Sequence, residues 1–194
     1  MTKLPAIILA SASPRRAEIL RASGWPFEAM PVNIDESRRE HEAAADYVKR
    51  LAREKAESAA ARRAGSIIVA ADTTVTIEEH ILEKPEGADD ARRMLRLLNN
   101  RWHQVLTGLA VFDGEQMIVA LEATQVKFAP LTDEEIQWYV GTGEPMDKAG
   151  GYAIQGLGAR LIKEIRGDYF NVVGLPLRLL YELVHANGQQ SPVP

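Results

Sequence analysis

The sequence predicts an α/β protein built on a mixed β-sheet. Two short apolar runs, 6–11 and 66–72, have the length of buried strands. Stretches with helical periodicity separate them, and 103–128 is the clearest hairpin, with Asp113 and Gly114 as its turn residues. Because strands and helices do not alternate strictly, we expect a mixed sheet and not a purely parallel one.

The N-terminal elements carry local start and stop signals. Ser13 is the expected N-cap of the first helix, with Pro14 at the first helical position and the end of the helix near Ala22. A strand over 27–32 and a helix over 44–63 follow. The first helix is therefore expected to connect two strands.

The other elements follow from the same signals. In chain order we expect a hairpin over 74–84, a helix over 87–99, the hairpin over 103–128, a short helix with a capping box of Thr132 and Glu135, a strand over 159–165 and a helix over 175–186. The Gly-rich stretch 141–158 is predicted as one long loop, which in a compact domain is usually functional or wrongly assigned. The chain 1–194 is expected to be a single domain with a frayed tail at 187–194.

Composition excludes several classes of function. The 194 residues carry 23 basic and 27 acidic side chains, a net charge of −4, which argues against a general nucleic-acid-binding protein. A small anionic ligand needs only a local basic pocket. With no cysteine, the chain has no disulfide, thiolate metal site or cysteine nucleophile, which fits the cytoplasm. No apolar stretch approaches the roughly 18 residues of a membrane span, so we expect no membrane partner.

The segment "LASASPRRAEIL" at 9–20 places two arginines where cations are unfavourable. Arg15 and Arg16 lie in the first turn of the predicted helix, the end that carries partial positive charge. One interpretation is a solvated first turn that Ser13 merely caps. The other is an anion site, in which Ser11, the guanidinium groups and the backbone N–H groups bind phosphate. The phosphate-loop pattern GxxxxGK[ST] is absent.

Two carboxylate regions follow predicted strands. Asp72 ends the buried run 66–72, at a place where open α/β sheets bind ligands, and it could act as a general base or a metal ligand. Asp35 and Glu36 follow the second strand. The alternatives are a turn aspartate and a solvated loop. If both regions are functional, they could share a Mg²⁺ ion together with substrate phosphates.

The remaining candidates are weaker when each is taken alone. Lys55, on a charged helix, and Lys84, before a proline, are both compatible with solvated lysines. His103 has no second histidine at ligand spacing, which favours a hydrogen-bonded structural histidine.

The Gly-rich loop offers one more candidate. Gln155 has a donor and an acceptor side by side, which suits the edge of a base. The alternative for this loop, which also holds Glu144, is a structural pair of Asp147 and Lys148.

Taken together, the motifs resemble the Maf family of nucleotide pyrophosphatases, also described as septum-formation inhibitors. The resemblance covers nearly the whole chain. In order, the matching motifs are "LASASPRRAEIL" at 9–20, "DE" at 35–36, "REKA" at 53–56, "ADTTV" at 71–75, "EKP" at 83–85, "HQVLTG" at 103–108, "GEPMDKAGGYAIQG" at 143–156 and "NVVGLPL" at 171–177. The "EKP" motif, in place of "GKP", and the "NNRW" before His103, in place of "SG", are small departures.

The resemblance implies a fold and a reaction. The fold would be inosine-triphosphatase-like, an elongated twisted mixed sheet with a cleft between two lobes. The reaction would be hydrolysis of a nucleoside triphosphate to the monophosphate and pyrophosphate with Mg²⁺ or Mn²⁺, in a homodimer. Asp72 matches the family's proton acceptor and, with Glu36, would be a metal ligand. The other polar site positions of the family match Ser11, Arg16, Lys55 and Lys84.

The family has two substrate branches, one for dTTP and UTP and one for 7-methyl-GTP. At three positions this sequence resembles the dTTP and UTP branch, with Arg15, Thr73 and Gln155. The resemblance implies that these residues determine which nucleotide is accepted. Three alternatives stay open at this point: the 7-methyl-GTP branch, a non-enzymatic nucleotide-binding regulator of septum formation, and an enzyme for modified pyrimidine nucleotides.

Overall fold

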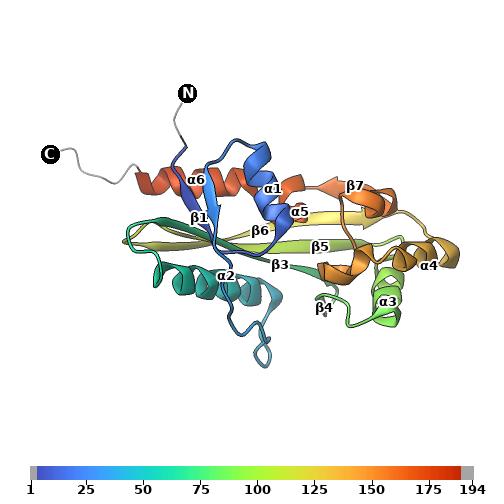
Figure 1. Cartoon of the computed structure of the whole chain (residues 1–194). Helices are drawn as coiled ribbons and strands as arrows, with labels where there is room; N and C mark the ends of the chain where they lie inside the picture. Colours follow the sequence, from blue (N-terminus) through green and yellow to red (C-terminus); the bar gives the residue numbers. More distant parts are fainter. Residues whose placement is uncertain (1–3, 189–194) are drawn as a thin grey trace. The chain divides into compact units, whose positions relative to one another are not determined.

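The computed structural model describes residues 4–188 and confirms the α/β class (Figure 1). Within that range one seven-stranded sheet has the order β2-β1-β3-β5-β6-β7, with β4 paired to β3. β1 is parallel to β2 and β3, whereas β4 is antiparallel to β3 and β7 to β6, so the sheet is mixed. The strands are β1 (Ile7–Leu9), β2 (Phe27–Ala29), β3 (Ile67–Ile77), β4 (His80–Leu82), β5 (Trp102–Phe112), β6 (Met117–Phe128) and β7 (Ile162–Arg166).

Helices occupy most of the connections between strands. They are α1 (Pro14–Ala22), α2 (Ala44–Ala60), α3 (Ala88–Leu98), α4 (Asp133–Gly141), α5 (Tyr169–Val173) and α6 (Leu177–Gly188), with 3₁₀ turns η1 (Glu144–Asp147), η2 (Ala149–Gly151) and η3 (Gly156–Leu161). The tail predicted over 187–194 overlaps the end of α6, and its residues 189–194 lie outside the described range.

The chain divides into two compact units. Unit 1 takes in the chain up to Asp72, then Thr107–Glu122 and the chain from Gly174 onward; unit 2 takes in Thr73–Leu106 and Ala123–Val173. β3, β5 and β6 each contribute residues to both units. The single domain with a cleft between two lobes stays a prediction.

Unit 1 has a core of small residues between α2 and the sheet. Ala52, Ala56 and Ala59 share one face of α2 and cluster with Ile68 and other buried residues of β1, β3 and β5. The close approach requires Gly108 on β5, because a Cβ there would lie 2.2 Å from the carbonyl oxygen of Val48 on α2. The helix is thereby held against β5, the neighbour of the strand β3 that carries Asp72.

Unit 2 has a core of larger side chains. Buried residues of α3 and α4, among them Leu95 and Tyr139, cluster with Val75, Phe128 and Tyr152. The capping box that begins α4 is present as predicted. Its two bonds run from the N–H of Glu135 to the hydroxyl of Thr132 at 3.2 Å and from the N–H of Thr132 to the carboxylate of Glu135 at 2.7 Å.

Other predictions need correction. β3 does not end at Asp72 but continues to Ile77, where its last residues pair with β4 in the predicted hairpin, so Asp72 lies in the middle of a strand. Ser13 occupies the N-cap position, but its side chain makes no capping hydrogen bond. Instead, the N–H of Ser13 donates to the hydroxyl of Ser11 at 3.1 Å.

The predicted and observed secondary structures differ most in the C-terminal third of the chain. The loop predicted over 141–158 contains the 3₁₀ turns η1 and η2 and the start of η3, and the strand predicted from 159 begins at Ile162 because η3 takes up the residues before it. The short helix α5 was not predicted. Isolated 3₁₀ turns have no hydrophobic periodicity of their own, so the sequence gives little sign of them.

Candidate active site

Ser11 and Arg16 form a buried pair at the start of α1. The Nη1 of Arg16 donates to the hydroxyl of Ser11 at 3.1 Å, and its Nε donates to the carbonyl oxygen of Gly174 at 2.7 Å. Burial lowers the pKa of Arg16, Asp72 opposes that shift, and Arg15 adds to it. The interpretation of this turn as merely solvated is therefore wrong for Arg16, whereas Arg15 is half-buried.

Ser11 is arranged to donate a hydrogen bond. Its oxygen already accepts two, from the N–H of Ser13 and from Arg16. A hydroxyl has two acceptor lone pairs and one proton, so the proton is left for a third group. A buried O–H beside a guanidinium is a suitable partner for a phosphate oxygen.

Lys55 joins two carboxylates on the face of β3 that α2 covers. Its Nζ lies 2.6 Å from Oδ1 of Asp72 and 2.7 Å from Oε1 of Glu36. Lys55 and Asp72 are largely buried, with side-chain exposures of 10% and 14%, while Glu36 is 53% exposed. The solvated-lysine interpretation is therefore wrong for Lys55, and the turn-aspartate interpretation is wrong for Asp72. A buried cation needs such partners, since the loss of its hydration costs several kcal/mol.

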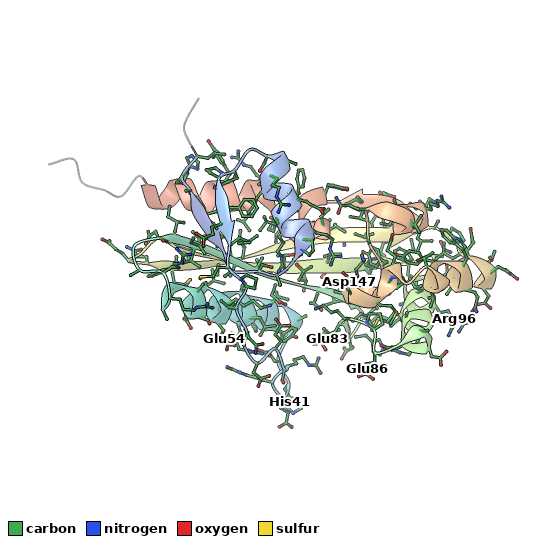
Figure 2. All side chains as sticks on the ribbon, in the orientation of Figure 1. His41, Glu54, Glu83, Glu86, Arg96 and Asp147 are labelled. Carbon is green, nitrogen blue, oxygen red and sulfur yellow. The ribbon has the colours of Figure 1, made fainter. Side chains whose placement is uncertain are left out.

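The loop that carries Glu36 is tied to α2. The hydroxyl of Tyr47 donates to the carbonyl oxygen of Glu36 at 2.9 Å, and Arg50 donates to that of Ser37 at 3.0 Å. Arg50 also holds Glu42 through two bonds of 2.6 and 2.8 Å, and its hydrogen bond lowers the pKa of Glu42 to about 2. His41 marks the tip of this loop (Figure 2).

The donor set of this cluster fits a divalent cation that also binds phosphate. Glu36 and Asp72 present oxygens to one common cation, the ammonium of Lys55. No group of three or more acidic or histidine side chains suited to a metal occurs within residues 4–188. Mg²⁺ commonly takes only one or two carboxylates and completes its shell with water and substrate phosphates.

Three predicted residues belong to unit 2. Thr73 follows Asp72 on β3, so its side chain points to the other face of the strand. Lys84 is exposed after β4. Gln155 is exposed, and its side-chain amide makes no hydrogen bond among the described residues. The structure thus brings together Ser11 with Arg16 and Lys55 with its carboxylates, all in unit 1.

Residues of the Gly-rich segment bind one another. The Nζ of Lys148 lies 2.5 Å from Asp147 and donates to the carbonyl oxygen of Glu144 at 2.7 Å, so the structural pair is present. The carboxylate of Glu144 accepts hydrogen bonds from the turn after Gln155. Sequence reasoning gave Glu144 no role, because these bonds follow from a turn that carries no sequence signal.

His103 is the structural histidine that was expected. Its Nε2 lies 2.6 Å from the hydroxyl oxygen of Tyr152, and both rings pack edge-to-face with Phe128. Burial lowers the pKa of His103 to about 4, so the ring is neutral at pH 7.

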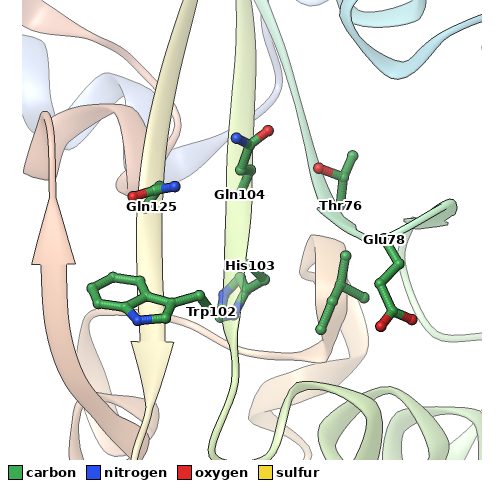
Figure 3. A pocket seen from close by; sticks show the side chains of 7 residues that line it. Thr76, Glu78, Trp102, His103, Gln104 and Gln125 are labelled. Carbon is green, nitrogen blue, oxygen red and sulfur yellow. The ribbon is translucent and has the colours of Figure 1, made fainter.

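A separate groove of about 340 Å³ lies within unit 2 (Figure 3). Its floor includes Thr76 of β3, Trp102 and Gln104 of β5, and Gln125 of β6. Arg166 lies over the ring of Trp102, at 4.3 Å from the centroid. The groove offers amides and an aromatic ring but no pair of carboxylates, so hydrolytic chemistry is better placed at Asp72.

Comparisons with known proteins agree with one another. A family model described as Maf-like protein matches residues 6–187. Curated relatives named dTTP/UTP pyrophosphatase include those of Symbiobacterium thermophilum, 49% identical over 92% of both chains, Koribacter versatilis, 45% over 94% of both, and Shigella sonnei, 46% over 93% of this chain and 92% of the relative.

Solved structures support the fold. The Ham1 protein of Staphylococcus aureus has a TM-score of 0.56 at 13% identity, covering 94% of this chain and 99% of that one. The HAM1 protein of Coxiella burnetii has a TM-score of 0.51 at 13% identity, covering 96% and 100%. These likenesses confirm the expected inosine-triphosphatase-like fold. Among the described helices, none has both the length and the apolar character to span a membrane.

Proposed function

The chain belongs to the Maf family, and on this premise we propose that it hydrolyses dTTP and UTP to the monophosphate and pyrophosphate, as the names of its relatives describe. The observation that carries the proposal is the position of Lys55 between the carboxylates of Asp72 and Glu36. A buried base and buried cations are what attack of water on a polyphosphate requires.

In this proposal Asp72 removes a proton from water. The water oxygen bonds to the α-phosphorus, the bond from that phosphorus to the oxygen bridging to the β-phosphorus breaks, and pyrophosphate leaves with the electron pair. The ammonium of Lys55 lies 2.6 Å from the carboxylate of Asp72 and holds that side chain in position. Arg16 and the O–H of Ser11 bind phosphate oxygens.

The proposal includes a divalent cation, Mg²⁺ or Mn²⁺. Oxygens of Asp72 and Glu36 would hold it, which the donor set described above supports. When bound, it would neutralise charge on the phosphate groups. Lys84 adds a further positive charge for the phosphates.

Arg15, Thr73 and Gln155 are proposed to select the base. The amide of Gln155 is exposed and unpaired among the described residues, so it can pair with the N3–H and a carbonyl of uracil or thymine. Cytosine has an acceptor at N3, and a purine is larger. We therefore expect dTTP and UTP to be better substrates than CTP, GTP or 7-methyl-GTP.

The test is pyrophosphate release from these five triphosphates with Mg²⁺ and, in parallel, Mn²⁺. Turnover of UTP and dTTP at the highest kcat/KM supports the proposal. Faster hydrolysis of 7-methyl-GTP would assign the chain to that branch. Adding dUTP analogues modified at C5 to the panel tests the modified-nucleotide alternative.

A regulator of septum formation that binds nucleotides without hydrolysis is the second candidate. Such a protein would need a phosphate pocket but no general base. The buried pair of Asp72 and Lys55 favours catalysis, since it places a carboxylate that can serve as a base beside a cation. Binding of UTP without pyrophosphate release would favour the regulator. The homodimer and the cytoplasmic location stay predictions.

A further inference from the structure

Glu144 binds the turn that follows Gln155. One carboxylate oxygen accepts hydrogen bonds from the N–H of Gly158 at 2.9 Å and the hydroxyl of Tyr139 at 2.9 Å. The other accepts one from the N–H of Leu157 at 3.0 Å. A single half-buried carboxylate therefore fixes two successive backbone groups.

Tyr139 fixes the chain on the other side of Gln155. Its side chain is fully buried, and its hydroxyl oxygen accepts a hydrogen bond from the N–H of Ala153 at 3.1 Å. The anchored residues therefore lie two positions before Gln155 and two and three positions after it. Gln155 itself has an extended backbone and an exposed side chain.

Two glycines make this arrangement possible. Gly156 has a φ of +67°, and a Cβ on it would lie 2.6 Å from a carboxylate oxygen of Glu144. A Cβ on Gly158 would lie 2.4 Å from the carbonyl oxygen of Ala153. The turn therefore closes tightly around the carboxylate, and the backbone beside Gln155 has little freedom.

The carboxylate is ionised under ordinary conditions. Burial alone would raise the pKa of Glu144, but the hydrogen bonds from Leu157, Gly158 and Tyr139, with the charge of Lys148, hold it below its ordinary value. All three hydrogen-bonding groups around it act as donors. An amide in its place would turn an N–H₂ group toward at least one donor.

We propose that Glu144, together with Tyr139, is a positioning residue that fixes the direction in which Gln155 presents its amide to the base. The proposal rests on the proposed function, in which Gln155 reads uracil or thymine. A free amide can exchange its oxygen and nitrogen by rotation and so adapt to cytosine. The bonds of Glu144 and Tyr139 fix the position and direction from which the Gln155 side chain begins, and so limit where its amide can lie beside the base. They therefore contribute to discrimination between bases and leave the phosphate chemistry in unit 1 unchanged.

The test compares Glu144→Gln with the matched surface change Glu134→Gln on α4, an exposed glutamate. For each variant, kcat/KM is measured with UTP and with CTP, and hydrogen exchange of the peptide 153–158 is followed by mass spectrometry. We expect the UTP-over-CTP ratio to fall about threefold to fivefold in Glu144→Gln, as expected for one weakened hydrogen bond. Protection of 153–158 should fall as well, and Glu134→Gln should change neither quantity.

A double variant shows whether Glu144 acts through Gln155. In a Gln155→Ala background, Glu144→Gln should leave the UTP-over-CTP ratio unchanged, because the amide it orients is gone. An equal fall in both backgrounds would overturn the proposal. Tyr139→Phe, which keeps the ring in the core, gives the same tests if Glu144→Gln does not fold.

The proposed function and this inference fail in distinguishable ways. Wild-type hydrolysis of UTP tests the first. An active Glu144→Gln variant with an unchanged UTP-over-CTP ratio overturns only the second. Exchange needs no activity, so unchanged protection of 153–158 in Glu144→Gln overturns the inference even if the wild type hydrolyses nothing.

Discussion

The two units bury different kinds of polar side chain. Within residues 4–188, the buried cations Arg16 and Lys55 both belong to unit 1. The buried polar side chains of unit 2 are neutral at pH 7. They are Thr74, His103, Thr124 and Asn171. Burying a charge costs far more than burying a hydrogen-bonded neutral group, so the difference requires an explanation.

In unit 2 two of these neutral groups, Asn171 and Thr124, bond to each other and to the backbone. The side-chain amide of Asn171 donates to the carbonyl oxygen of Val105 and to the hydroxyl of Thr124, both at 3.0 Å. Such bonds join segments that are distant in the sequence and define the fold. In unit 1, Lys55 lies 2.6 Å from Asp72, and the charge of Asp72 also acts on Arg16. A structural core does not need two such cations, whereas a polyphosphate would use them. The proposal therefore assigns the phosphate chemistry to the charged groups of unit 1, whereas the buried polar groups of unit 2 hold its own fold together.

The largest expected effect concerns the charged groups of unit 1. Asp72→Asn keeps the shape of the side chain and an oxygen for Lys55 but removes the base. Loss of a general base typically lowers kcat about 10²- to 10⁴-fold. Pyrophosphate release from UTP, beside a thermal melt, checks the effect, and Asp46→Asn on the exposed start of α2 serves as the control. Near-normal turnover by folded Asp72→Asn would remove Asp72 from its role.

The buried neutral histidine of unit 2, His103, predicts that the free energy of unfolding depends on pH. Folding lowers the pKa of His103 from its ordinary value of 6.5 to about 4. Between pH 6.5 and pH 4 the histidine is protonated in the unfolded chain but neutral in the folded chain, which favours unfolding. The contribution of neutral His103 to the free energy of unfolding is therefore complete above pH 6.5 and is lost as the pH falls toward 4. The loss is on the order of 3 kcal/mol by pH 4. Urea unfolding of the wild type and of His103→Gln at pH 7 and 4.5 measures it, and parallel pH dependences would contradict it.

The lysines give an intermediate effect. Lys55→Ala removes a charged partner of Asp72 and Glu36, and hydrogen bonds to charged groups contribute about 1.5–3 kcal/mol. We therefore expect kcat/KM for UTP to fall roughly tenfold to a hundredfold, with some loss of stability. Lys84→Ala should lower kcat/KM with an unchanged melting temperature, since exposed Lys84 makes no ion pair among residues 4–188. Unchanged kcat/KM in Lys84→Ala would show that Lys84 is a solvated lysine with no part in the reaction.

Features that depend on residues close together in the sequence could be predicted from it, whereas contacts between distant residues could not. The turn at Asp113 and the capping box at Thr132 are local, and both are present. The bond from Arg16 to Gly174 joins residues 158 positions apart, and no spacing rule indicates it. The continuation of β3 past Asp72 likewise depends on pairing with β4. Lys55 and Asp72 were each expected as site residues, but their contact could be seen only in the tertiary structure.

The smallest expected effect concerns Gln155. Because its side chain is exposed, water replaces part of any bond that the amide loses, and the cost should lie near 1 kcal/mol, roughly fivefold. Gln155→Ala should therefore lower the UTP-over-CTP ratio of kcat/KM about fivefold while changing kcat for UTP much less. The same ratio measured in Asp72→Asn, at its reduced rate, should match the wild type, because Gln155 and Asp72 belong to different units. A selective loss of UTP turnover in Asp72→Asn, or an unchanged ratio in Gln155→Ala, would show that the two units do not divide the work in this way.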